Sequence, residues 1–314
     1  MNKIAILIPC YNEEITVQKV VNDFKKELPS AEIYVYDNNS SDNTAQLASE
    51  AGAIVRKCYQ QGKGYVVRNM FNEIEADCYV LVDGDDTYPA SQVHKLIDGV
   101  LNEKVDMVIG DRLSNGTYAN ENKRGFHNFG NNLVRALINN LFHSNINDIM
   151  TGYRAYSRKF VKCVPIMSNG FQIETEMSVF SVVYGLNIKE IPIIYRDRPV
   201  GSDSKLNTFS DGFKVLLTLF NLFKDYRPLL FFSITGLIFF ILSLLIGVPV
   251  VNEFYHTGFI LKMPSAILAA SLMVIAILNL AIGLIMDAIK NQSIFNFKQR
   301  VNLFYQLDNI NNNK

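Results

Sequence analysis

The sequence predicts an α/β domain with a mostly parallel sheet, followed by an amphipathic helix and two transmembrane helices. Three observations lead to this prediction. Short apolar runs alternate with helical patterns over residues 1–208, polar clusters follow several of these runs, and two long uncharged stretches come later. Alternating strands and helices are typical of a parallel sheet with helices on both faces. A chain of 314 residues is long enough for one such domain and an appendage.

The predicted elements of the first domain begin with residues 4–8. This continuous apolar run ends at Pro9, as expected for a strand buried on both faces. The next elements are a helix at 14–28, a strand at 33–36, a helix at 44–51, and strands at 53–55, 79–82 and 107–109. Ligands of such sheets bind at the carboxyl ends of the strands. Polar clusters fall at these ends, at residues 11–13, 37–40 and 83–86.

The composition excludes two classes of protein. The 30 basic and 30 acidic residues balance, so no overall field attracts nucleic acid, and we expect no nucleic-acid partner. The four cysteines lack paired spacing, so we expect reduced thiols rather than disulfides or a metal cluster.

Two uncharged stretches, residues 229–251 and 263–286, predict the membrane part. Each exceeds the roughly 20 apolar residues that a helix needs to cross about 30 Å of hydrocarbon. The alternative is a pair of core helices in a soluble protein, which would need a large surrounding domain, and only residues 287–314 follow. Residues 209–228 have one apolar and one polar helical face, which favours an interfacial helix in the headgroup plane over a core helix.

The charges beside these stretches predict the orientation. Basic residues flank the pair of stretches on the outside: Lys224, Arg227, Lys290, Lys298 and Arg300. An excess of Lys and Arg marks the cytoplasmic side, so we expect both ends of the chain in the cytoplasm. No signal peptide is visible before the first strand. The Asn-rich residues 287–314 are expected to be a cytoplasmic tail, partly disordered at its end.

The acidic cluster at residues 83–86 follows an apolar strand. Asp83 and Asp85 are two residues apart, so an extended chain would point both carboxylates the same way. Two such oxygen ligands suit Mg²⁺ or Mn²⁺, which would bridge to a diphosphate. A solvated acidic turn is the alternative, and the placement at a strand end favours the metal site.

Two further clusters have a functional and a local interpretation. Asp37 could accept a hydrogen bond from a nucleotide base or ribose. Alternatively, it could be a helix cap or fix a turn, and residues 40–42 already offer caps for the next helix. Residues 61–64 open a helix, where N–H groups and Lys63 would attract phosphate; a flexible turn is the alternative. The chain has neither a P-loop nor a Gly-x-Gly-x-x-Gly pattern, so nicotinamide chemistry is unsupported.

Together these clusters resemble family 2 glycosyltransferases of the GT-A fold. The resemblance rests on the order and spacing of IPCYNEE at 8–14, YDNNSSDNT at 36–44, GKG at 62–64 and DGDDTYP at 83–89. Residues 110–112, 148–154 and 195–206, with the two transmembrane helices, are similar to the dolichol-phosphate mannose synthase and bacterial polyprenyl-phosphate glycosyltransferase branch.

The resemblance implies an inverting transfer of a sugar from a nucleotide-sugar to polyprenyl phosphate. The acceptor is already anionic, so the reaction has little need of a general base. The implied donor-binding residues are Pro9, Tyr11, Glu13, Asp37, Lys63, Asp83 and Asp85, with the metal on Asp83 and Asp85. The implied catalytic residues are Asp85 and Asp148. The candidates for holding the acceptor phosphate are Arg112, Arg124, Arg198 and Lys205.

The resemblance favours UDP-glucose or UDP-N-acetylglucosamine as donor over GDP-mannose. It also implies a multi-pass protein of the plasma membrane with a cytoplasmic catalytic domain, a homo-oligomer such as a tetramer, and a flippase that receives the product. Two rivals remain: a catalytically silent membrane-tethered scaffold that binds nucleotide-sugar, and direct transfer to a polysaccharide or protein. Intact Asp83 and Asp85 argue against the first, and the acceptor arginines against the second.

Three departures from the family pattern stand out. Asn38 replaces the second Asp of the usual pair after the second strand, and Thr87 stands where mannose-transferring relatives often carry a Gln metal ligand. The chain has no Trp, so it lacks the Gln-x-x-Arg-Trp motif of processive synthases.

Glu174 and Glu176 could line the sugar pocket, although ordinary positions on a helix surface explain them equally well.

Overall fold

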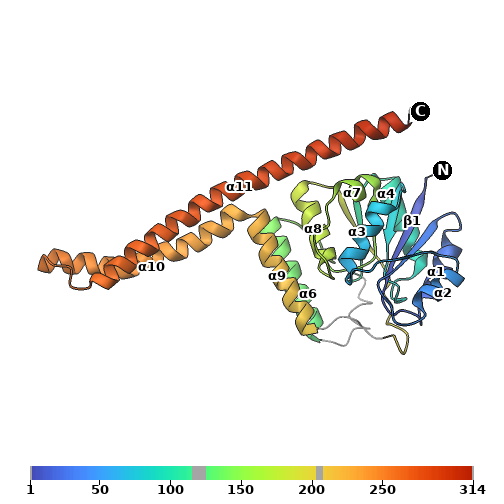
Figure 1. Ribbon diagram of the computed structural model, residues 1–314, viewed down its shortest axis with the longest axis horizontal. Helices are drawn as coiled ribbons and strands as arrows, with labels where there is room; N and C mark the ends of the chain where they lie inside the picture. Colours follow the sequence, from blue (N-terminus) through green and yellow to red (C-terminus); the bar gives the residue numbers. More distant parts are fainter. Residues whose placement is uncertain (1, 115–124, 203–207, 313–314) are drawn as a thin grey trace. The chain divides into compact units, whose positions relative to one another are not determined.

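The computed structural model describes residues 2–114, 125–202 and 208–312. Within them the chain divides into two compact units, one reaching to Thr218 and including the helical residues from Gln299 onward, the other comprising Leu219–Lys298. The described residues of the first unit contain one seven-stranded sheet in the order β3-β2-β1-β4-β6-β5-β7 (Figure 1). Its strands are β1 Ile4–Cys10, β2 Glu32–Asp37, β3 Ile54–Lys57, β4 Cys78–Leu81, β5 Met107–Asp111, β6 Arg154–Ser157 and β7 Ile188–Pro192.

The mostly parallel sheet confirms the predicted fold class. β1 pairs in parallel with β2 and β4, β2 with β3, and β5 with β7. β6 is antiparallel to both β4 and β5. The sequence did not indicate β6 or β7, and the five predicted strands all exist with bounds shifted by a few residues.

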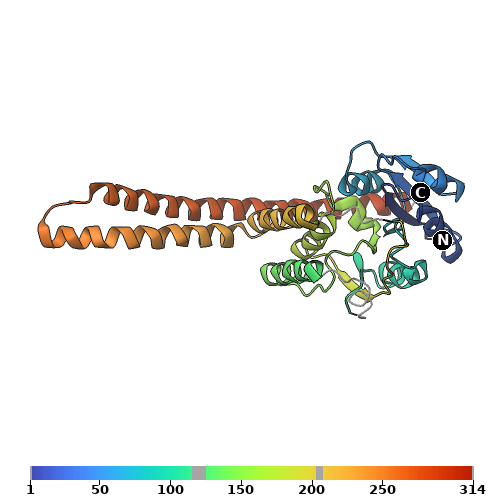
Figure 2. The same cartoon turned by 90° about the horizontal axis from the view of Figure 1, so that it is seen from below.

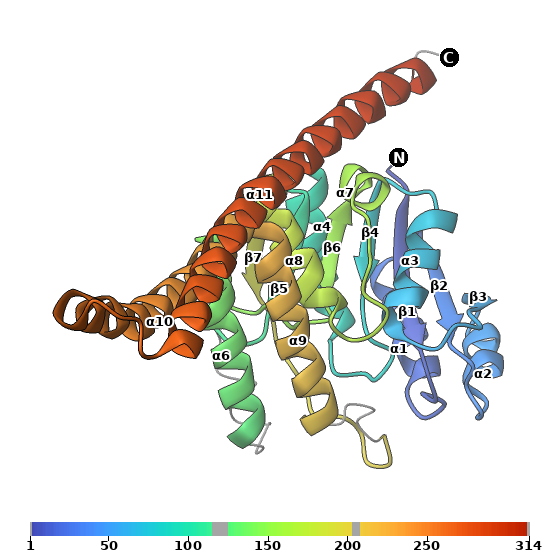
Figure 3. The same cartoon turned by 60° about the vertical axis from the view of Figure 1, so that its left-hand side comes forward.

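Helices cover both faces of this sheet, as Figure 3 shows for α3, α7 and α8 on one face. The helices of the α/β domain are α1 Val17–Glu27, α2 Thr44–Glu50, α3 Lys63–Glu73, α4 Val93–Leu101, α6 Gly125–Phe142, α7 Arg158–Cys163 and α8 Ile173–Tyr184, with a 3₁₀ turn η1 at Ala90–Gln92. The predicted helix at 14–28 begins three residues later, at Val17. Side chains of β1 alternate between the two faces and all of residues 5–8 are fully buried, which explains the unbroken apolar run.

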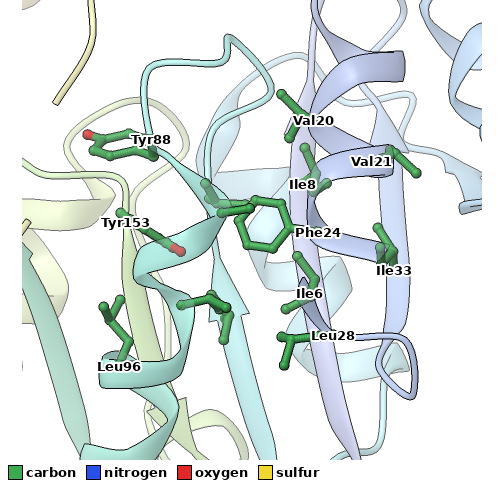
Figure 4. Close-up of a cluster of buried hydrophobic side chains, with 14 of the residues drawn as sticks. Ile6, Ile8, Val20, Val21, Phe24, Leu28, Ile33, Tyr88, Leu96 and Tyr153 are labelled. Carbon is green, nitrogen blue, oxygen red and sulfur yellow. The ribbon is translucent and has the colours of Figure 1, made fainter. Parts of the chain in front are cut away.

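The main core lies between the sheet and helices α1, α2 and α4. Phe24 of α1 packs against the ring of Tyr153 edge to face, with ring centroids 6.2 Å apart (Figure 4). Ile6 and Ile8 of β1 and Leu96 of α4 belong to the same buried cluster. The four cysteines are also buried, as free thiols.

The second unit is built on a helical hairpin. After α9, Thr208–Tyr226, the chain forms α10, Pro228–Thr257, and α11, Met263–Asn312, which run antiparallel (Figure 2). Thr235 donates a hydrogen bond to Asn279 at 3.0 Å, and Ser243 donates one to the carbonyl of Ala269 at 2.8 Å. Such polar contacts between small side chains are typical of membrane helix pairs.

Both helices of the hairpin are long and apolar enough to cross a membrane. Only 11% and 17% of the residues in their most apolar stretches are buried, which argues against core helices of a soluble protein. Two such helices suggest that the chain is anchored in a membrane. The orientation that the flanking charges predict, and the interfacial position of residues 209–228, stay predictions; Leu216, Leu217 and Phe220 of α9 are exposed apolar side chains.

α11 is longer than the membrane segment predicted within it. The sequence predicts a transmembrane helix at residues 263–286 and a cytoplasmic tail at 287–314, and α11 continues through the tail segment to Asn312. Its 50 residues correspond to about 75 Å of helix, far more than the about 30 Å of a hydrocarbon core. The physical reason is that residues 287–312 contain neither Gly nor Pro, so nothing in this polar segment ends the helix.

The core predicts a measurable cost for one substitution. We expect Phe24→Ala to lower the free energy of unfolding of the α/β domain by about 3–5 kcal/mol, because it removes a ring that is 1% exposed. Chemical denaturation followed by circular dichroism measures this change. Ile15→Ala is the control, because Ile15 is 53% exposed and its loss should cost less than about 0.5 kcal/mol. Equal denaturation midpoints for the two variants would contradict the packing described here.

Candidate active site

The polar residues predicted at the strand ends do meet at one edge of the sheet. β1, β2 and β4 are parallel, so the loops that follow them leave the same edge. The loop after β1 is bonded to its neighbours on both sides. Glu13 N–H donates to Thr44 Oγ1 at 2.8 Å, and Thr16 Oγ1 donates to the carbonyl of Gly84 at 2.6 Å. The three loops therefore form one connected surface.

Lys63 is buried between two carboxylates. Its Nζ lies 2.6 Å from Asp83 Oδ1 and 2.6 Å from Glu174 Oε1. Burial alone would lower the pKa of Lys63, but the charges of the two carboxylates outweigh burial and raise the pKa above its ordinary value. Lys63 is thus an ammonium group, and Asp83, with a side chain 29% exposed, is the accessible member of the three.

The turn that carries Lys63 is tightly packed rather than flexible. Gly62 has φ +137°, in the region that favours glycine. A Cβ atom on Gly64 would lie 2.0 Å from the carbonyl oxygen of Ser168, and the N–H of Gly64 donates to the carbonyl of Asn169 at 3.1 Å. Both glycines of the Gly-Lys-Gly motif are needed because the backbone of residues 168–169 lies against them.

Asp85 is held by a hydroxyl and a guanidinium. Thr87 Oγ1 donates to Asp85 Oδ1 at 2.6 Å, and Arg198 Nη2 lies 2.5 Å from Asp85 Oδ2. Arg198 Nη1 also lies 3.9 Å from Glu13 Oε1. Burial, followed by the charge of Asp83, raises the pKa of Asp85, while Arg198 and Thr87 act against this rise.

In the ion pairs that the described residues form at this edge, carboxylates outnumber cations. These ion pairs join four carboxylates and two cations, namely Glu13, Asp83, Asp85 and Glu174 with Lys63 and Arg198. With all six groups ionised, two negative charges remain within this set. Carboxylate oxygens and a deficit of two charges fit Mg²⁺ or Mn²⁺. Among the described residues no three acidic, His or Cys side chains form a ready-made metal cage, so diphosphate oxygens and water would complete the coordination.

The hydrogen bonds of Asn38 explain why Asn rather than Asp stands at this position. Its amide donates to the carbonyls of Cys58 at 3.0 Å and Gln60 at 2.7 Å, and its carbonyl accepts from the N–H of Gly62 at 2.7 Å. An ionised Asp could not make the first two bonds, because it has no donor. Its neighbour Asp37 is 4% exposed and accepts from the N–H of Ser40 at 3.2 Å, so the turn interpretation describes its contacts; its role toward a nucleotide stays a prediction.

Arg112 and Asp148, predicted separately, form one buried pair. Arg112 Nε lies 2.7 Å from Asp148 Oδ2 and Nη2 lies 2.9 Å from Oδ1. Burial alone would raise the pKa of Asp148, but the charge and hydrogen bonds of Arg112 outweigh it and hold the pKa below its ordinary value. The pair fixes the segment that leads to Gly152, where a Cβ would lie 2.2 Å from Asp83 Oδ2.

The remaining predicted residues fall into two groups. Pro9, the penultimate residue of β1, pairs with Tyr36. Tyr11 follows the strand and is 40% exposed, and the side chain of Arg198 is 26% exposed. Arg124 and Lys205 lie outside the described residues.

Two glutamates of α8 are more deeply buried than their sequence positions suggested. Glu174 is 4% and Glu176 7% exposed, so ordinary helix-surface positions do not describe them. Glu176 accepts the N–H groups of Met167 and Ser168 at 3.0 and 2.9 Å. A signal was present, because apolar residues occur on every side of this helix and such helices are buried all round.

The sequence profile of glycosyl transferase family 2 matches residues 5–164, half of the chain. This chain is a family 2 glycosyltransferase. Its matched region includes Glu13, Lys63, Asp83 and Asp85 of this edge and the Arg112–Asp148 pair, while Glu174 and Arg198 lie beyond it.

Named relatives of this glycosyltransferase are found in an archaeon. Glycosyltransferase AglJ of Haloferax volcanii is 35% identical over 237 residues, which covers 74% of this chain and 76% of AglJ. The dolichyl-phosphate hexose transferase of the same organism is 30% identical over 209 residues, covering 67% of this chain and 89% of the relative.

A solved structure shares the fold. The glucosyl-3-phosphoglycerate synthase of Mycobacterium tuberculosis, in complex with Mn²⁺, UDP and glucosyl-3-phosphoglycerate, aligns with a TM-score of 0.58 at 21% identity, covering 70% of this chain and 80% of that one. The catalytic unit of this glycosyltransferase therefore has the GT-A fold.

The close approach of Gly152 to Asp83 gives a test of the site. We expect Gly152→Ala to weaken the binding of Mn²⁺ in the presence of UDP by about tenfold or more, because the new Cβ would displace the Asp83 carboxylate. Mn²⁺ titration followed by electron paramagnetic resonance measures this. Gly170→Ala is the control, because its Cβ would meet only the flexible end of Gln172. If the two variants bind Mn²⁺ equally well, Asp83 is not where the metal binds.

Proposed function

We propose that this glycosyltransferase moves a sugar from a nucleotide diphosphate sugar to a polyprenyl phosphate. The observation that carries the proposal is the ion pair between Arg198 and Asp85. It sets a partly exposed guanidinium beside the carboxylates that suit a metal-bound diphosphate. An anionic acceptor needs such a cation, and a neutral acceptor does not.

The acidic edge supports the donor half of the proposal. Asp83 and Asp85 would hold Mg²⁺ or Mn²⁺, which neutralises the diphosphate leaving group when bound. The Mn²⁺ and UDP of the similar mycobacterial enzyme agree with this assignment. Asp37 and the exposed ring of Tyr11 are the proposed contacts of the nucleotide, and Pro9 and Glu13 shape the same edge.

The segment that contains Arg198 supports the acceptor half. The N–H of Arg196 donates to the carbonyl of Thr87 at 2.9 Å, and Ser202 Oγ donates to Glu13 at 3.5 Å, so this segment crosses the acidic edge. Arg198 would bind the acceptor phosphate through charge-assisted hydrogen bonds. The phosphate is itself the nucleophile, so no side chain has to remove a proton.

The other basic candidates take different places in the proposal. The Arg112 guanidinium is bonded to Asp148, which supports a positioning role for both residues rather than direct contact with substrate. Arg124 and Lys205 are proposed as further phosphate ligands on the resemblance alone.

The donor favoured here is UDP-glucose or UDP-N-acetylglucosamine, with GDP-mannose as the alternative. The dolichyl-phosphate hexose transferase among the relatives supports a hexose and a lipid phosphate. We further propose that the reaction takes place at the cytoplasmic face of the plasma membrane, that the enzyme is a homo-oligomer such as a tetramer, and that a flippase receives the product.

A transfer assay tests this function. Full-length protein in detergent is incubated with undecaprenyl phosphate, Mg²⁺ or Mn²⁺, and each of the three donors in separate reactions, and lipid products are identified by mass. We expect one glycolipid, formed with one class of donor and lost with a chelator. Nucleotide binding without any lipid product would overturn the acceptor and favour a silent scaffold or a neutral acceptor.

The Asp85 carboxylate should be indispensable in that assay. We expect Asp85→Asn to reduce product formation by about 100-fold or more, because the amide cannot replace a charged metal ligand. Full activity of this variant, with nucleotide still bound, would support the scaffold instead.

Arg198 should act on the acceptor rather than on the donor. We expect Arg198→Gln to raise the KM for undecaprenyl phosphate by about 10- to 100-fold, the usual value of a hydrogen bond to a charged group. The affinity for Mn²⁺ and UDP should not fall. Arg196→Gln is the matched control, since this exposed arginine lies two residues away in the same segment. An unchanged KM for the lipid in Arg198→Gln would exclude the proposed contact.

A further inference from the structure

The Lys63 side chain has a second carboxylate partner that no donor ligand requires. Asp83, the accessible partner, follows β4, whereas Glu174 comes from the first turn of α8 and is almost completely buried. If Lys63 served only to bind phosphate, a buried carboxylate on its other side would be a costly addition. The contact therefore has to be explained by what it does to Lys63 and, through Lys63, to Asp83.

We propose that Glu174 is a positioning residue that holds the Lys63 ammonium against Asp83 and keeps this part of the donor site negatively charged. The inference rests on the proposed function, because it assigns a role within the metal and nucleotide half of that site. It adds a third carboxylate, contributed by α8, to the two that the strand-end motif supplies.

The charges of Lys63, Asp83 and Glu174 decide whether this part of the site attracts a divalent cation. Lys63 and Asp83 alone would form a neutral pair, so the ammonium would cancel the charge that a divalent cation needs. Glu174 adds one negative charge 2.6 Å from the same ammonium, and the set of three then carries a net negative charge. Because Lys63 and Glu174 are buried, their interaction is screened less than it would be in water.

The backbone holds both ends of the Lys63–Glu174 contact in place. Arg68 donates to the carbonyls of Ile166 at 2.8 Å and Met167 at 3.0 Å, which fixes the chain before α8. Glu176 accepts the N–H groups of Met167 and Ser168, which ties that chain to the start of α8. The same segment packs against Gly64, next to Lys63. Lys63 and Glu174 are thus set by one framework.

Glu174 also lies in the first turn of α8. The N-terminus of a helix carries a partial positive charge, so a carboxylate in the first turn is stabilised there. Helix, ammonium and carboxylate therefore support one another, and substitution of Glu174 by Gln changes the charge while an oxygen that can accept from Lys63 remains.

The test is direct binding of Mn²⁺ by the full-length protein, with and without UDP, followed by electron paramagnetic resonance. We expect Glu174→Gln to weaken Mn²⁺ binding in the presence of UDP by about 10- to 100-fold, as is usual when a residue behind a metal ligand is changed. Glu174→Asp, which keeps the charge, should bind more tightly than Glu174→Gln. Glu75→Gln is the charge-matched control, because Glu75 is likewise ion-paired, with Lys162 and Arg158, but its side chain is 62% exposed.

A double substitution tests whether Glu174 acts through Lys63. In the Lys63→Met background, Glu174→Gln should have little further effect, because the group that it positions is gone. A loss from Glu174→Gln in the Lys63→Met background as large as in the wild-type background would show that Glu174 acts without Lys63 and would overturn the inference. So would wild-type Mn²⁺ affinity in Glu174→Gln, or equal weakness of the Gln and Asp variants.

The same experiment separates this inference from the proposed function. If the wild-type protein binds neither Mn²⁺ nor UDP, the donor half of the proposed function fails, and with it the role of Glu174. If the wild-type protein binds both and forms the glycolipid while Glu174→Gln behaves identically, only the inference fails. In the expected case, Glu174→Gln also shows a raised KM for the nucleotide-sugar and an unchanged KM for undecaprenyl phosphate.

Discussion

The geometry of the donor site depends on one buried ammonium group. Lys63 comes from α3, and its two carboxylate partners come from the loop after β4 and from α8, so three elements distant in the sequence meet at a single atom. Removing Lys63 would leave the buried carboxylate of Glu174 without this partner, which costs several kcal/mol. The Gly-Lys-Gly motif is therefore best understood as a packing requirement. Its glycines admit the backbone of residues 168–169, and the lysine between them joins the loop after β4 to α8.

Burial and tertiary contacts also decide which parts of the fold the sequence could predict. β1, β2, β4 and β5 are visible because they are buried between two layers of helices, which leaves an apolar run in each. β3 lies at the edge of the sheet and is mostly exposed. β6 is different, because it begins with the fully buried Arg154. That guanidinium donates to the carbonyls of Thr151 and Ile149 and to Ser178 of α8. No local sequence pattern predicts that a buried arginine will find these hydrogen-bond acceptors. β7 is half-exposed and ends in Pro192, so its sequence signal is equally weak.

The site likewise contains residues that the sequence could place and partners that it could not. Asp37, Asp83 and Asp85 could be placed from the sequence because parallel strands bring their carboxyl ends together whatever the side chains are. Their partners could not be placed, since they depend on tertiary contacts. Thr87 orients Asp85, Asn38 bonds to the turn before α3, and Glu174 reaches Lys63 from α8. The residues that differ from the family pattern, Asn38 and Thr87, are thus explained by the hydrogen bonds that they make here.

Charge balance connects the two halves of the proposed reaction. Asp85 is shared, because it faces the proposed metal on the donor side and is bonded to Arg198 on the acceptor side. Without a divalent cation, Arg198 compensates Asp85 and Glu13, and its guanidinium is committed to them. A divalent cation would supply the two charges that the ion pairs of this edge lack. The attraction between Asp85 and Arg198 would then weaken, because the carboxylate would be shared with a stronger charge. In the proposed reaction the donor and its metal therefore prepare the cation that an anionic acceptor needs, and two mutually repelling phosphate groups can be held at one edge of the sheet.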